Sequence, residues 1–73
     1  MEKESKEERF KRVASNRVKR ILHDLKLLGN CSNKGMYSWN DDHMRKIWSA
    51  IDQEYKMCKA QFAKNSKPRN FEL

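Results

Sequence analysis

The sequence predicts an all-α fold, an antiparallel two-helix hairpin that dimerises into a four-helix bundle. Two segments, about residues 5–28 and 41–63, lack glycine and proline and carry apolar residues at helical spacing. Residues 29–40 between them hold both glycines of the chain. Long helices joined by a short loop form antiparallel neighbours. We therefore expect one helical hairpin over residues 1–65, followed by a C-terminal tail over residues 66–73.

The first predicted helix has one apolar stripe, with residues recurring every three or four positions. From Ala14 onward the spacing matches two heptads of a coiled-coil seam. Gly29 directly follows the stripe, so we expect it to end the helix as a left-handed cap. The stripe consists of Phe10, Ala14, Val18, Ile21, Leu25 and Leu28.

The second predicted helix begins after Asn40, an N-cap residue that two aspartates follow. Ser38 offers an alternative cap two residues earlier. Trp39 and Met44 have the spacing of a hydrophobic staple around Asn40. The apolar stripe of this helix is rich in aromatic residues and consists of Met44, Ile47, Trp48, Ile51, Tyr55, Cys58 and Phe62.

The small size of the chain indicates self-association. It has 73 residues, of which 37% are hydrophobic and 37% charged, and so short a chain buries a modest core. In a lone hairpin the second stripe would leave Trp48, Tyr55 or Phe62 partly exposed, which is typical of an interface. We expect a two-fold homodimer. The alternative is a monomer whose open groove binds another protein.

The net charge of +7 is concentrated in the first helix and the tail. Residues 9–26 contain seven basic residues and one acidic residue. This balance favours nucleic acid, an anionic membrane surface or an acidic protein as partner. The highly charged start differs from a signal peptide, and no apolar run approaches the roughly 20 residues of a spanning helix. We therefore expect a cytoplasmic protein without membrane association.

A basic face lies opposite the apolar stripe of the first helix. Its residues recur at steps of three and four and span about 25 Å at the rise of an α-helix. It can be interpreted first as a solvated face whose long side chains cover the edges of the core. The alternative is a phosphate-contacting surface, which we keep because no alternating glutamate neutralises the face. The face consists of Arg9, Arg12, Asn16, Lys19, His23 and Lys26.

Catalytic and metal-binding functions are not indicated. Cys31, Cys58, His23 and His43 lack the close spacings of zinc ligands, so we expect no metal and no cofactor. Nothing orients a base toward a nucleophile, and no glycine-rich phosphate loop is present. We expect a protein that is not an enzyme. In a cytoplasmic protein both cysteines are free thiols, with Cys58 in the core.

Two functions remain. The first is a nucleic-acid-binding accessory protein that contacts phosphates through the basic face, with the choice between DNA and RNA left open. The alternative is a protein–protein adaptor or inhibitor, with the basic charge speeding encounter with an acidic partner. Whether its C-terminal tail docks or is disordered stays open. Its interface would consist of Trp48, Tyr55, Phe62, Phe71 and Leu73.

One segment resembles a group of bacterial proteins. The run Leu27-Leu-Gly-Asn-Cys-Ser-Asn33 is followed by Tyr37, an acidic cap, and then Ile47, Ala50 and Ile51. Together these resemble small uncharacterised bacterial proteins, often encoded on mobile elements of Gram-positive bacteria. The resemblance covers residues 9–73 and implies a bacterial cytosolic setting, without an activity, cofactor or functional residue. Trp39 and Trp48 stand where that group leads us to expect Tyr and Phe, which should leave the architecture unchanged.

Overall fold

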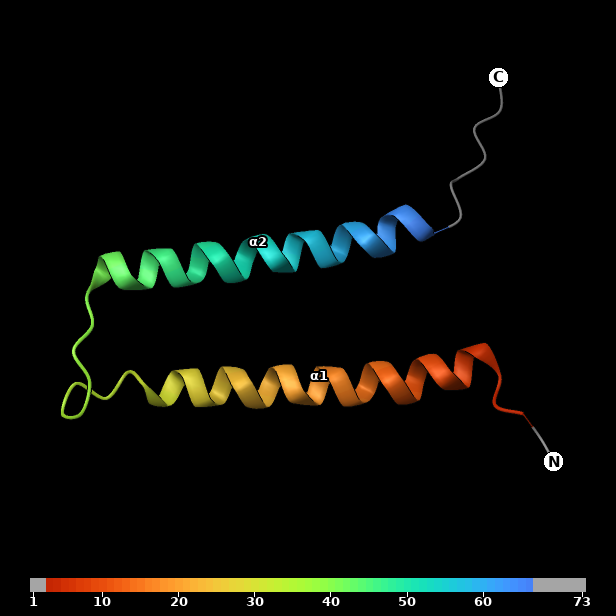
Figure 1. Cartoon of the computed structure of the whole chain (residues 1–73), viewed down its shortest axis with the longest axis horizontal. Helices are drawn as coiled ribbons and strands as arrows, with labels where there is room; N and C mark the ends of the chain where they lie inside the picture. The colour runs from red at the N-terminus through yellow and green to blue at the C-terminus, as the bar shows by residue number, and fades with distance from the viewer. Residues whose placement is uncertain (1–2, 67–73) are drawn as a thin grey trace, which may run out of the picture. The chain divides into compact units, whose positions relative to one another are not determined.

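The computed structural model describes residues 3–66 and contains two α-helices. Helix α1 comprises Lys6–Asn30 and helix α2 comprises Asp41–Asn65, each a continuous ribbon of 25 residues (Figure 1). No strand occurs in the described range. The all-α prediction is confirmed, and both helices run two residues further than the sequence pattern indicated. No helix in the described range is long and apolar enough to cross a membrane.

Helix α1 begins with a capping box. Ser5 Oγ accepts a hydrogen bond from the Glu8 backbone N–H at 3.0 Å, and Glu8 Oε1 accepts one from the Ser5 N–H at 3.0 Å. The pair satisfies two backbone donors that the first turn leaves open. The Ser5 backbone N–H, which donates to the Glu8 carboxylate, lowers the pKa of Glu8.

The end of α1 corrects the prediction for Gly29. No glycine in the described range has a positive φ, and Gly29 lies within the helix rather than capping it. Cys31 is the C-cap, with right-handed helical angles, and its N–H donates to Leu28 O at 3.0 Å. Ser32 N–H donates to Gly29 O at 3.1 Å. These short-range bonds close the last turn, so the chain leaves the helix without a left-handed residue.

The connection between the helices contains a turn centred on Asn33. The Asn33 carbonyl accepts from Met36 N–H at 3.1 Å and from Tyr37 N–H at 2.9 Å. Its side-chain Oδ1 accepts from Gly35 N–H at 2.9 Å, so the asparagine organises the turn through both its main chain and its side chain. Asn33 and Gly35 therefore lie together in the turn that follows α1.

Helix α2 begins at the predicted cap. Asn40 Oδ1 accepts from His43 N–H at 2.8 Å, which selects Asn40 over the alternative cap at Ser38. His43 Nδ1 in turn accepts from Asn40 N–H at 3.3 Å and completes a capping box. Trp39 and Met44, the predicted staple pair, are both half-buried although most of this helix is exposed.

The end of α2 is closed by polar side chains. Asn65 Nδ2 donates to Gln61 O at 2.9 Å, and Ser66 Oγ donates to Ala63 O at 2.9 Å. The Ala63 carbonyl is one of the four that the end of the helix leaves without an intrahelical partner. Ser66 is extended, and the rest of the predicted tail, including Phe71 and Leu73, lies outside the described residues.

The chain divides into two compact units, one that ends at Ser38 and one that begins at Trp39. None of the side chains in residues 3–66 is buried. The prediction that Cys58 is a core residue is therefore wrong for the single chain, in which both cysteines are exposed. The half-buried positions are Val13, Ala14, Leu28, Trp39, Met44 and Ile47.

Candidate nucleic-acid interface

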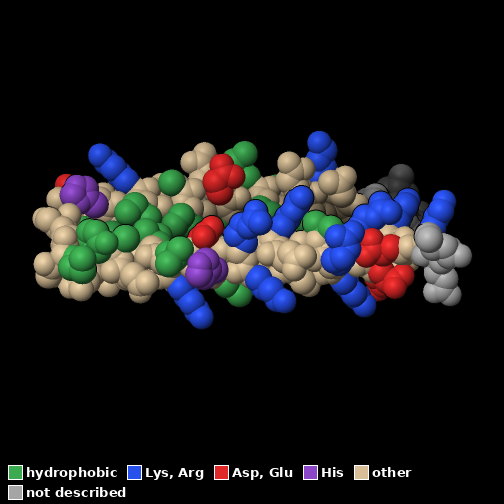
Figure 2. All heavy atoms as spheres, turned by 60° about the horizontal axis from the view of Figure 1, so that its bottom comes forward, with side chains coloured by type: hydrophobic (Ala, Val, Ile, Leu, Met, Phe, Trp, Pro, Cys, Tyr) green, Lys and Arg blue, Asp and Glu red, His purple; other side chains and the backbone are tan. Residues whose placement is uncertain are grey.

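The six residues of the predicted basic face all lie on α1 and are exposed. Their spacing of three and four residues keeps them on one side of the helix, opposite the apolar stripe. Val18 and Ile21 of that stripe are also exposed, at 50% and 57%. Figure 2 shows Lys and Arg side chains reaching outward at a surface where apolar side chains are also visible. The helix therefore offers solvent both a cationic and an apolar face.

A shallow hollow follows the first half of the basic face. It is lined by Arg12, Val13, Asn16, Arg17 and Arg20. Arg12 and Asn16 belong to the predicted face, whereas Arg17 and Arg20 were missed. Arg20 follows Asn16 by four residues, so i,i+4 counting from the predicted residues would have found it. The lining thus combines three arginines with Asn16, residue types whose donors suit phosphate oxygens.

Glu4, which lies outside the alternating positions of the helix, forms ion pairs with the N-terminal part of the basic face. Arg12 donates from Nε to Glu4 Oε2 at 2.8 Å and from Nη2 to Glu4 Oε1 at 3.0 Å. Arg9 Nε lies 3.8 Å from Glu4 Oε1. Glu4 precedes the N-cap, so helical spacing does not relate it to either arginine. Glu4 lies outside α1, beyond the extended N-cap Ser5, so its bonds to Arg12 extend across the start of the helix.

The Glu4–Arg12 pair favours the charged form of both groups. Hydrogen bonding from the Arg12 side chain lowers the pKa of the Glu4 carboxyl, and the same bonds raise the pKa of Arg12. The pair is solvent-exposed, so it is screened by salt and contributes little to stability. Its main effect is to occupy the guanidinium donors of Arg12.

The second half of the basic face has no comparable acidic partner. Within residues 3–66, Lys19, His23 and Lys26 form no ion pair. Their side chains are exposed, so both lysine ammonium groups are available to an anion without first leaving a carboxylate. The basic face thus has an occupied N-terminal part and an accessible C-terminal part.

The predicted protein interface on α2 is strongly exposed. Trp48 is 51% exposed, and Tyr55 and Phe62 are each 59% exposed. The three aromatics recur every seven residues, so they form one line along the helix. Lys59 Nζ lies 5.2 Å from the centroid of the Tyr55 ring, a cation–π geometry. The other two residues predicted for this interface, Phe71 and Leu73, lie outside the described range.

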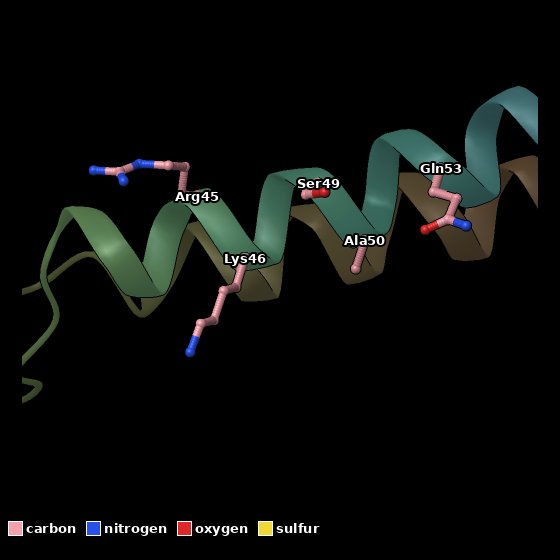
Figure 3. A pocket seen from close by; sticks show the side chains of 5 residues that line it. All are labelled: Arg45, Lys46, Ser49, Ala50 and Gln53. Atoms are coloured by element: carbon pink, nitrogen blue, oxygen red, sulfur yellow. The ribbon is translucent and has the colours of Figure 1, made fainter.

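A second shallow hollow lies on the polar side of α2, away from the aromatic line. It is lined by Arg45, Lys46, Ser49, Ala50 and Gln53, and Figure 3 shows the first two side chains pointing in different directions. Arg45 pairs with Asp42, Nη1 to Oδ1, at 3.3 Å. Sequence analysis did not identify this hollow. Its cationic groups diverge, so they do not converge on a single small ligand.

The thiol and imidazole groups do not assemble into a metal site within residues 3–66, where no three His, Cys, Asp or Glu side chains gather. Cys31 Sγ lies 3.9 Å from Leu27 O in a weak contact, and His43 uses Nδ1 for the capping box. Of the four Cys and His residues considered as metal ligands, Cys31 and His43 thus have local structural roles.

Comparison with known proteins adds no relative to this description. No protein-family model matches the chain, and no curated protein or solved structure matches it either. The resemblance to proteins of mobile elements stays a prediction.

Proposed function

We propose that this protein is a small non-enzymatic module that binds nucleic acid through the basic face of α1. Lys19 and Lys26 would contact successive phosphates, with Arg17 and Arg20 at the edge of the same surface. Phosphate contacts of this kind depend little on base sequence and weaken as salt rises, because binding releases condensed counterions. Asn16 adds to the face an amide that can both donate and accept hydrogen bonds.

One observation carries the proposal. The cations of the basic face are exposed along α1, and Lys19 and Lys26 form no ion pair in the described part of the chain. A solvated face without a ligand also exposes its lysines, but the clustering of positive charge remains costly through self-repulsion. A polyanion removes this repulsion, which favours a binding role over a purely solvated one.

The proposal is tested with a short fluorescent duplex titrated at about 50 and 200 mM salt. The variant Lys19→Gln/Lys26→Gln should bind the duplex more weakly. The slope of log affinity against log salt concentration should become shallower by about two, because each lost phosphate contact reduces its magnitude by about 0.9. Lys46→Gln/Lys64→Gln removes the same charge from α2 and is the control, which should retain most of the affinity. Equal losses in both variants, or wild-type protein that ignores the duplex at low salt, would refute the proposal.

We propose further that the helices pair as an antiparallel hairpin and that two hairpins form a four-helix bundle. The proposal is supported by the seam-like spacing on both helices and by their exposed apolar residues, including Leu25 at 41% and Ile51 at 37%. Exposed apolar residues in this number are costly in water. Sedimentation equilibrium over a range of concentrations tests it, and a monomer at every concentration would contradict it.

A protein partner is the second candidate function, favoured by the exposed line of Trp48, Tyr55 and Phe62. Aromatic residues are enriched at interfaces and dominate their energetics. The test is a nuclease-treated pull-down that compares the wild-type protein with Tyr55→Ala/Phe62→Ala. A stoichiometric partner lost in this variant and retained by Lys19→Gln/Lys26→Gln would support the adaptor function. Failure to recover such a partner counts against it.

A further inference from the structure

The Glu4 carboxylate is held by two arginines at the N-terminal end of the basic face. Arg12 contacts it with two nitrogens, at 2.8 and 3.0 Å, and Arg9 Nε lies at 3.8 Å. The Glu4 side chain is 33% exposed, compared with 64% for Arg9 and 58% for Arg12. The acid is therefore the most enclosed member of the cluster, and both arginines remain accessible from solvent.

The geometry of this contact is that of oxyanion recognition. A guanidinium group binds a carboxylate and a phosphate in the same way, through two parallel N–H···O bonds. The donors that Arg12 gives to Glu4 are therefore the donors that it would give to a phosphate of the nucleic-acid backbone. Both ligands cannot use Nε and Nη2 of Arg12 at once.

We propose that Glu4 is an intramolecular competitor that occupies the phosphate-binding donors of Arg12 and lies beside the charge of Arg9. This inference depends on the proposed nucleic-acid function and concerns the regulation of the same face. Free protein engages phosphates through Lys19 and Lys26, and Arg12 joins only when a phosphate displaces Glu4. The competitor lowers the affinity of the face for weakly charged anions more than for a polyanion, which supplies many phosphates at high local concentration.

The expected size of the effect is modest, because the competing contact is exposed to solvent. Exposed ion pairs of this kind change equilibria by a factor of about two to five. Removing Glu4 should thus raise duplex affinity by about two- to fivefold at low salt. The slope of log affinity against log salt concentration should also become steeper, by about 0.9 for the phosphate contact that Arg12 gains.

Glu4→Gln and Glu7→Gln form a matched pair for the experiment. Each removes one negative charge near the start of α1, but Glu7 contacts only Lys11, at 3.9 Å, among the ion pairs of the described residues. Both are measured with the fluorescent duplex at about 50 and 200 mM salt. We expect the gain for Glu4→Gln and a smaller one for Glu7→Gln. In a protein that already carries Arg12→Gln, adding Glu4→Gln should increase duplex affinity much less than it does in the wild-type protein.

The outcomes separate the inference from the proposed function. Equal gains in affinity from Glu4→Gln and Glu7→Gln would show that the gain comes only from the change in net charge. That result would overturn the competitor role of Glu4. Wild-type binding that Glu4→Gln leaves unchanged would also overturn it, with the function intact. If neither protein binds the duplex, both proposals fail. Glu4 lies outside α1, so Glu4→Gln should leave the helix intact. Far-ultraviolet circular dichroism of each variant checks that the helicity is retained.

Discussion

Asn40 and His43 cap each other at the start of α2. The His43 N–H donates to Asn40 Oδ1 at 2.8 Å, and the Asn40 N–H donates to His43 Nδ1 at 3.3 Å. A histidine here takes the place of the glutamate or glutamine that usually completes a capping box. The same arrangement, built from Ser5 and Glu8, starts α1. Both helices are therefore closed at their N-termini by side chains that lie three residues apart.

Replacing the Asn40 cap should destabilise α2. Asn40→Ala removes the acceptor for the His43 N–H, and loss of such a cap costs about 1 kcal/mol. We expect a lower thermal midpoint and lower helicity by far-ultraviolet circular dichroism. Gln53→Ala, in the exposed middle of α2, is the control and should leave the midpoint unchanged or raise it, because alanine is the better helix former. An unchanged midpoint in Asn40→Ala would contradict the capping role.

The two glycines should respond to alanine in opposite ways. Gly29 is helical without positive φ, and a Cβ there would meet nothing within 4 Å. Gly29→Ala should raise the free energy of unfolding by about 0.5 to 1 kcal/mol, because it restricts the unfolded chain and favours helix. At Gly35 a Cβ would lie 3.1 Å from Asn33 Oδ1, the atom that accepts the Gly35 N–H.

Gly35→Ala should therefore gain less than Gly29→Ala or be destabilising, since it crowds the Asn33 turn. Chemical denaturation of the two variants in parallel measures the difference. A loss of stability in Gly29→Ala would instead indicate a left-handed cap at this position, as the sequence pattern alone suggested.

Acid should weaken the start of α1. The pKa of Glu8 is lowered mainly by its hydrogen bond from the Ser5 backbone, and the pKa of Glu4 mainly by its hydrogen bond from Arg12. A carboxyl whose pKa is lowered on folding stabilises the folded form above its unfolded pKa and loses this effect as pH falls through its folded pKa. Helicity should therefore fall as the pH drops below the ordinary glutamate value of 4.5.

Glu8→Gln separates the two contributions to this acid transition. Glutamine still completes a capping box but does not titrate, so the variant should keep more helicity in acid than the wild-type protein. A pH titration of circular dichroism for both proteins measures it. Identical acid profiles would show that the capping box does not contribute to the transition.

Self-association should protect Cys58 but not Cys31. Both thiols are exposed in the single chain, but only Cys58 lies on the apolar stripe of α2, which the proposed bundle would cover. The rate of thiol labelling at Cys58 should fall as protein concentration rises, and that at Cys31 should stay constant. The variants Cys31→Ser and Cys58→Ser assign the two rates. Concentration-independent labelling of Cys58 would place it outside any interface.

Local pattern was sufficient to predict much of this protein. Periodic apolar residues indicated both helices, and Asn40 followed by two aspartates located the start of α2. These features depend on residues within one or two helical turns, and the same short-range geometry governs the folded chain. The Ser5–Glu8 capping box follows the same rule, and its spacing was present in the sequence although our prediction did not use it.

The remaining features depend on choices that residue spacing leaves open. Glycine suits a left-handed cap and also tolerates a helix, so only the backbone angles place Gly29 within α1. Glu4 reaches Arg12 across eight residues from outside the helix, and no helical period relates the two. The sequence alone thus determined where the helices lie and which face is basic. The three-dimensional structure decided how α1 ends and that Glu4 binds Arg12 of the basic face. Both features depend on the backbone conformation at the ends of the helix.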